Sequence, residues 1–272
     1  MRSLIYFVKM ANNPLLLSSG ALFHLPVREM FTISKKAQFD GLELIFDDNP
    51  ETSDGELIRR LVKEFDVPVF SVHIPMGKCS VFGNKAANIV RRSFDIAQSV
   101  GATGLVIHPE RNEDKRYERN VISVLQEYSA DSSVTLFLEN MPRRNFSSTT
   151  TPFYDPVYLS QLHTPLCLDT SHLATSHLDF STVVSAVAEN VGHVHFSDST
   201  ISADEHGVIQ DEHLPVGRGT LPLGEVIWSL QKTGYRGAYC LELRPTLFRD
   251  MLVDNIILLL GELCGSARRL IA

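Results

Sequence analysis

Eight short apolar runs alternate with longer segments of helical periodicity along this 272-residue chain. Apolar runs without polar alternation are typical of parallel strands that are covered on both faces. The expected strands are Leu15–Ser19, Gly41–Phe46, Val67–His73, Gly104–His108, Thr135–Glu139, Leu166–Asp169, His193–Ser197 and Ala238–Leu243. The expected helices are Val27–Ala37, Gly55–Glu64, Ala86–Val100, Tyr117–Tyr128, Pro156–Leu162, Thr182–Glu189, Leu223–Thr233 and Thr246–Leu263.

This repeat predicts an α/β fold, a single-domain (β/α)8 TIM barrel. A closed barrel of this kind uses about 250 residues as one domain. No Gly-x-Gly-x-x-Gly follows the first expected strand, which disfavours an open dinucleotide-binding sheet. We expect one domain over residues 1–272, with 1–12 as a candidate N-terminal extension in which Leu4–Met10 forms an extra strand or a plug.

Composition narrows the classes of protein to consider. The net charge of −7 argues against a broad basic surface that grips a polyanion. The longest apolar runs, such as 256–260, are far shorter than the about 20 residues that span a membrane. The four cysteines form no Cys-x-x-Cys pair, and the N-terminus lacks a secretory signal, so we expect buried free thiols and a cytoplasmic location.

Acidic and imidazole side chains occur where the expected strands end. In a barrel the carboxyl ends of the strands meet at one mouth, which is where active sites lie. The residues at or just after these ends are His73, His108, Glu139, Asp169, His172, His195, Asp211, His213 and Glu242. So many charged groups need neutralisation, and bound divalent cations supply it. Because the donors are nitrogen and oxygen without a thiolate, zinc or manganese is expected.

The motifs around these residues resemble the xylose-isomerase-like barrel superfamily and, within it, the endonuclease IV (class II AP endonuclease) family. The strongest match is Cys167-Leu-Asp-Thr-Ser-His172, which follows that family's Cys-Leu-Asp-Thr-Cys-His with Ser171 in place of a cysteine. Further matches are Val194-His-Phe-Ser-Asp-Ser199, Asp211-Glu-His213 and Gly217-Arg-Gly219, together with the His108-Pro109 and Glu139-Asn140 pairs. The resemblance covers roughly residues 15 to 265.

The resemblance implies three divalent metal ions, with Glu139 bridging two of them. The implied ligand sets are His73, His108 and Glu139; Glu139, Asp169, His195 and Glu242; and His172, Asp211 and His213. The second set alone would fit sugar isomerases and epimerases equally well. The remaining histidines and the Asp-x-His pair favour the endonuclease IV pattern.

Two departures from that family concern residues that it uses to bind DNA. Met76 stands where the family has a tyrosine, and Glu212 stands where it has an arginine. These changes remove an aromatic and a positive group from the rim of the mouth. Lys78 and Arg218 are the candidate substrate-binding residues, because a cation there can meet a phosphate and the glycines beside Arg218 allow close approach.

The leading hypothesis is a metal-dependent phosphoesterase, either a phosphatase or a phosphodiesterase. Its metal ions would clamp a phosphate ester and activate a water, which Glu139 and Glu242 would orient as catalytic residues. The substrate would be a small phosphate ester or abasic-site nucleic acid, and no membrane partner is expected.

The alternative hypothesis is a sugar or sugar-phosphate isomerase or epimerase. It would use one metal ion, with Glu139 and Glu242 transferring a proton. That class often has an arginine six residues after the seventh-strand histidine and a glutamate six residues after the fifth-strand glutamate. These positions are Ile201 and Asn145, which weighs against it. A third hypothesis, an inactive barrel that only binds a ligand, is disfavoured because all nine candidate metal ligands are present.

Overall fold

The expected barrel is confirmed. The computed structural model describes residues 13–46, 49–75, 86–109, 133–143, 155–203 and 209–272. Eight parallel strands pair in chain order, and β1 closes the barrel onto β8. The strands are β1 Leu15–Ser18, β2 Gly41–Ile45, β3 Val69–His73, β4 Gly104–Ile107, β5 Thr135–Glu139, β6 Leu166–Asp169, β7 Val191–His195 and β8 Ala238–Leu241.

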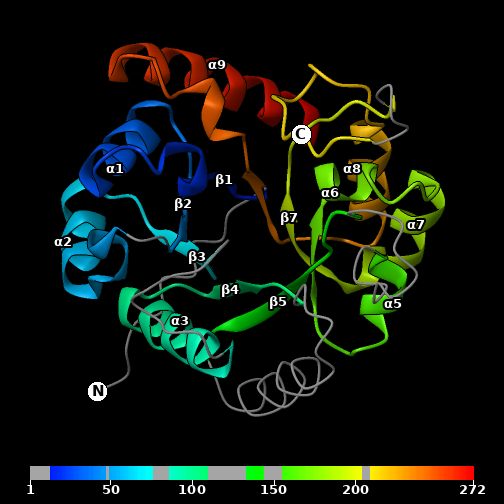
Figure 1. Cartoon of the computed structure of the whole chain (residues 1–272), viewed down its shortest axis with the longest axis horizontal. Coiled ribbons are helices and arrows are strands. Elements are labelled where there is room, and N and C mark those ends of the chain that lie inside the picture. The colour runs from blue at the N-terminus through cyan, green and yellow to red at the C-terminus, as the bar shows by residue number, and fades with distance from the viewer. Residues whose placement is uncertain (1–12, 47–48, 76–85, 110–132, 144–154, 204–208) are drawn as a thin grey trace.

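Helices surround these strands, and Figure 1 shows α9 beside α1 on the outside of the barrel. The α-helices are α1 Val27–Lys36, α2 Gly55–Phe65, α3 Ala86–Val100, α5 Pro156–Ser160, α6 Thr170–Ala174, α7 Phe180–Val187, α8 Leu223–Lys232 and α9 Val253–Ile271. Short 3-10 turns occur at Ser19–Leu22, Pro50–Ser53, Ala188–Asn190 and Pro245–Leu247. Among the described residues no helix is long and apolar enough to cross a membrane.

Several predicted boundaries differ from the structure, most clearly those of the seventh strand and the last helix. The seventh strand was expected at His193–Ser197 but runs from Val191, because the pairing with β6 shifts between Leu166 and Cys167. The last helix was expected at Thr246–Leu263 but runs from Val253 to Ile271, since Pro245 opens a 3-10 turn and Leu252 is extended. The expected helix Tyr117–Tyr128 and the segment Leu4–Met10 lie outside the described residues.

The apolar core lies between the strands and the helix ring. β1, β2, β4, β6 and β8 are buried along their whole length, as expected for parallel strands covered on both faces. The closure of β1 on β8 is reinforced by Asn13, whose Nδ2 donates to the carbonyls of Tyr235 and Gly237 at 3.2 and 2.8 Å. These contacts join the amino ends of β1 and β8, at the end of the barrel opposite the mouth.

A buried carboxylate organises the loop after β7. Asp198, which is 2% exposed, accepts backbone N–H groups from Ser199 at 2.9 Å, Leu221 at 3.1 Å and Gly217 at 2.9 Å. Its own backbone pairs with Leu214 in both directions at 2.8 Å. Residues 214–221 are therefore folded back against the end of β7.

Candidate metal centre

The structure brings the strand-end residues together at the carboxyl end of the barrel. His73, Glu139, Asp169 and His195 are the last residues of β3, β5, β6 and β7. His108 and Glu242 follow β4 and β8 directly, one residue beyond Ile107 and Leu241. Because the carboxyl ends of all the parallel strands lie at one mouth of the closed barrel, residues far apart in sequence meet here.

Glu139 lies at the centre of this group and is 1% exposed. Its Oε2 is 3.2 Å from His73 Nε2 and 2.9 Å from His108 Nε2. Its Oε1 is 3.0 Å from His195 Nδ1 and 3.3 Å from His172 Nδ1. One carboxylate therefore meets four imidazoles, consistent with the bridging position that the sequence assigned to it.

Four buried residues could hold one metal ion. Glu139, Asp169, His195 and Glu242 each offer a ligand atom, and these atoms lie within 4.8 Å of one another. His195 Nδ1 is 2.7 Å from Glu242 Oε2 and 3.5 Å from Asp169 Oδ2. Yet Asp169 Oδ2 and Glu242 Oε2 are buried and make no hydrogen bond to any described residue. Buried carboxylate oxygens without hydrogen bonds are costly, so the donor set fits a divalent cation.

Asp169 serves the site and the local fold at once. Its Oδ1 accepts the backbone N–H of His172 at 2.7 Å and so caps the short helix α6. Its Oδ2 points to the group just described. This cap sets His172 beside Asp169, and the Asp-Thr-Ser-His spacing of the sequence follows from one turn of helix.

A second group lies beside the first. Asp169, His172 and His213 have ligand atoms within 4.8 Å of one another. Asp211 adjoins them, with Oδ2 3.4 Å from His172 Nε2 and Oδ1 3.1 Å from His213 Nε2. Ser171, the residue in place of a cysteine in the sequence motif, donates its hydroxyl to Asp211 at 2.9 Å. A further possible set is His73, Glu139 and His195.

Opposite charges favour the ionised forms of Glu242 and His213 in the metal-free protein. Burial opposes the charged form of Glu242, but His195 and His213 outweigh it and hold the pKa of that carboxyl at about 2. Burial likewise opposes the His213 imidazolium, but Asp169 and Asp211 raise its pKa to about 9. Protonated imidazoles therefore balance the carboxylates when no cation is bound.

This balance predicts how stability depends on pH. The folded pKa of His213 lies above its ordinary value of 6.5, so its contribution is complete below pH 6.5 and is lost as pH rises through about 9. From that shift, the metal-free protein should lose about 3 kcal/mol of stability over this range. A cation that binds His213 would replace its proton and remove this loss.

Thermal unfolding of chelator-treated protein, measured from pH 6 to 9.5, tests this expectation. The melting temperature should fall as pH rises from 6.5 through about 9. A melting temperature that stays constant over this range would contradict the ion pairs described above.

The two predicted substrate-binding residues are not placed at the metal centre by the structure. Lys78 lies outside the described residues, as does Met76. Arg218 is exposed, and its side chain makes no ion pair or hydrogen bond with a described residue. Glu212 directs its carboxylate to Thr200, accepting the backbone N–H at 2.8 Å and the hydroxyl at 2.6 Å.

Sequence reasoning missed two residues that support the centre. Arg244 Nε donates to the carbonyl of Glu212 and its guanidinium reaches the Asp211 carbonyl at 3.4 Å, so it fixes the segment that carries Asp211 and His213. Glu43 is fully buried in the middle of β2. Its only signal in the sequence is a lone acidic residue inside an apolar strand.

The fold and the candidate centre define a barrel protein with a buried group of carboxylates and imidazoles at its mouth. A model of the xylose isomerase-like TIM barrel family matches residues 31–252, and the chain belongs to this family. An uncharacterised protein of Mycobacterium tuberculosis is 29% identical over 259 residues, covering 86% of this chain and 90% of that protein.

Solved structures share the barrel. A D-tagatose 3-epimerase-like protein has a TM-score of 0.68 at 20% identity, covering 95% of this chain and 100% of its own. An AP endonuclease of family 2 from Brucella melitensis has a TM-score of 0.63 at 17% identity, covering 85% of this chain and 93% of its own. At these identities the likeness concerns the fold alone.

Proposed function

We propose that this protein is a metal-dependent isomerase or epimerase of a sugar or sugar phosphate, which reverses the order of the two enzyme hypotheses drawn from the sequence. The observation that carries the proposal is the buried four-ligand group of Glu139, Asp169, His195 and Glu242, in which two glutamates adjoin one cation position. Sugar epimerases also recur among the proteins that share this barrel.

The chemistry follows from the two glutamates. A divalent cation in the group, Mn²⁺ or Zn²⁺, would polarise a sugar carbonyl and its neighbouring hydroxyl. Glu139 and Glu242 are ionised in the metal-free protein, so either can accept a proton from the carbon beside the carbonyl. Return of a proton to the opposite face inverts that carbon, and return to the neighbouring carbon exchanges aldose for ketose. Neither outcome needs an oxidant.

The remaining mouth residues suit a polyhydroxylated substrate. The side chains of His108, His213 and Asp211 are partly exposed beside the four-ligand group and can donate to or accept from hydroxyl groups. Ile201, six residues after His195, is 46% exposed and supplies no cation, while Asn145 lies outside the described residues. Substrate contacts at this position would therefore differ from those of the sugar isomerases and epimerases that have an arginine there.

A second candidate, hydrolysis of a phosphate ester, is favoured by one specific observation. Asp169, His172 and His213 form an additional ligand group, with Asp211 beside it, as the three-metal pattern requires. Its substrate would be a small phosphate ester or abasic-site nucleic acid, with Lys78 and Arg218 as phosphate partners. Glu212 stands at the rim of the mouth where the endonuclease IV family has an arginine, and its carboxylate accepts a hydrogen bond from Thr200. This position therefore offers no positive charge to DNA, which favours the small ester.

Two measurements on one preparation separate these functions. Protein purified without chelator is analysed for metal per chain, then incubated with Mn²⁺ and a panel of ketoses in D2O. The proposal expects one tightly bound ion and deuterium at the carbon that is inverted or isomerised. Three ions per chain, with hydrolysis of a phosphomonoester or nicking of an abasic-site duplex and no exchange into ketoses, would establish the second candidate instead.

His213→Ala supplies the matched control. Under the isomerase proposal, the metal content of this variant stays at one ion per chain, because the four-ligand group is intact. Under the phosphoesterase candidate it falls by about one equivalent, since one of few ligands is lost from the additional group.

A further inference from the structure

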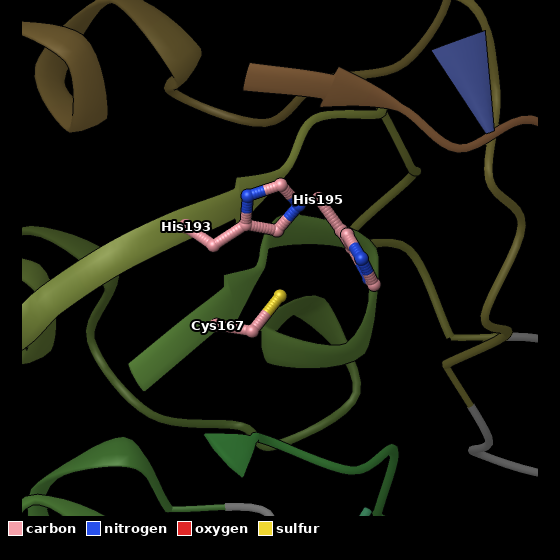
Figure 2. Close-up of side chains that lie close together, drawn as sticks. All are labelled: Cys167, His193 and His195. Carbon is pink, nitrogen blue, oxygen red and sulfur yellow. The ribbon is translucent and has the colours of Figure 1, made fainter. Parts of the chain in front are cut away.

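The barrel interior beneath the mouth is polar. TIM-barrel interiors are dominated by Val, Ile and Leu. Here the strands instead contribute Glu43, Ser71, Cys167, His193 and Cys240, each at most 2% exposed. Figure 2 shows Cys167 of β6 and His193 and His195 of β7 pointing toward one another. This set, the polar layer, lies directly against the metal centre through His195.

Glu43 is the charged member of the polar layer that contacts the centre. Its Oε1 is 2.9 Å from His195 Nε2, and its Oε2 is 3.0 Å from His193 Nε2. Ser71 donates its hydroxyl to Oε2 at 2.7 Å. Burial disfavours the carboxylate, but the charges of His195 and His193 outweigh it and hold the pKa of Glu43 well below its usual value. Glu43 therefore has one carboxylate oxygen turned to each imidazole.

His195 lies between Glu43 on one side and the carboxylates of the metal centre on the other. Its Nδ1 faces the metal centre, 2.7 Å from Glu242 and 3.0 Å from Glu139. Its Nε2 lies 2.9 Å from Glu43 Oε1, and in the metal-free protein it makes no hydrogen bond to any described residue. A neutral imidazole has one protonated nitrogen and one lone pair. For Nδ1 to bind a cation, the proton has to be on Nε2, and Glu43 is the acceptor placed there.

We propose that Glu43 is a positioning residue of the metal centre: it accepts the Nε2 proton of His195 and thereby turns the Nδ1 lone pair toward the cation. Glu43 does not touch the metal ion or the substrate. A carboxylate behind a ligand histidine fixes the ring and makes it a stronger donor. The inference rests on the metal ion of the proposed function but not on the substrate.

Glu43→Gln tests this role with little change of shape. The carboxamide has one acceptor oxygen where the two imidazoles and Ser71 now share two, and it loses the charge that strengthens His195. Titration of the metal-free proteins with Mn²⁺ should show the affinity lowered by about 10–100-fold. Co²⁺-loaded wild type and variant should also differ in their visible spectra, because the field of the histidine ligand changes.

Ser71→Ala is the matched control, since it alters the same polar layer without removing the contact between Glu43 and His195. Its Mn²⁺ affinity should stay within about 3-fold of wild type, as expected for the loss of one neutral hydrogen bond outside the ligand shell. Thermal unfolding without metal shows whether each variant is folded. Wild-type Mn²⁺ affinity and an unchanged Co²⁺ spectrum in folded Glu43→Gln would overturn the inference.

The outcome is separable from the proposed function. Weakened Mn²⁺ binding in Glu43→Gln supports the positioning role even if no ketose is converted. Ketose exchange in wild type together with unaltered Mn²⁺ binding in the variant would leave the function standing and remove the role of Glu43.

Discussion

Glu139→Gln is expected to lower kcat by about 10³-fold or more, in keeping with the loss of a group that transfers the reacting proton. The same change should weaken metal binding by at least about 100-fold, because a neutral amide replaces the charged ligand. The structural reason is the contact of this one carboxylate with His73, His108, His172 and His195, all between 2.9 and 3.3 Å. Turnover and Mn²⁺ titration measure the two effects.

The metal-free variant should also be less stable, since removing one partner of a buried ion pair costs about 3–5 kcal/mol. Activity is therefore compared at a temperature where both proteins are folded, as judged by circular dichroism. Glu262→Gln, an exposed glutamate on α9, is the control and should match wild type in all three measurements. Near-normal turnover in folded Glu139→Gln would place the reaction elsewhere in the molecule.

Asp198→Ala is expected to cause a large loss of stability, about 3–5 kcal/mol, because three backbone N–H groups lose their buried acceptor. For a chain of this size the melting temperature should fall by about 10 °C. Asp198→Asn should cost about 1 kcal/mol, since its amide oxygen can still accept from Ser199 and Leu221 while the bond to Gly217 is lost.

Differential scanning calorimetry of wild type, Asp198→Ala and Asp198→Asn measures the order of their melting temperatures. Metal content should change little in Asp198→Asn, because Asp211 and His213 precede the loop that Asp198 holds, and Arg244 fixes them independently. If alanine and asparagine were equally tolerated, the carboxylate would not be what holds residues 214–221.

The barrel and most of the site could be predicted because both depend on local patterns. An apolar run that ends in His or Asp predicts a strand whose last residue lies at the mouth. Closure of the barrel then brings these strand ends together. Thus His73 and Asp169 were found at the right strand ends without any knowledge of contacts.

What could not be predicted depends on pairing between distant strands. The start of β7 at Val191 results from a register shift against β6, which leaves no trace in the sequence of β7 itself. Helix α6 was not predicted, because Asp169, which caps its first turn, had been interpreted only as a candidate metal ligand. Glu43 belongs to no spaced motif, and its place behind His195 arises only when β2 and β7 line the same interior.

The pairing of β1 with β8 has a consequence for how the protein is made. Asn13 contacts carbonyls 222 and 224 residues further along the chain, and Leu17 pairs with Leu241. During synthesis, β1 therefore has no partner on its outer edge until β8 has left the ribosome. Contacts of such long sequence separation form slowly. In the interval the growing sheet keeps an open edge, which makes this barrel a candidate for protection by chaperones before it closes.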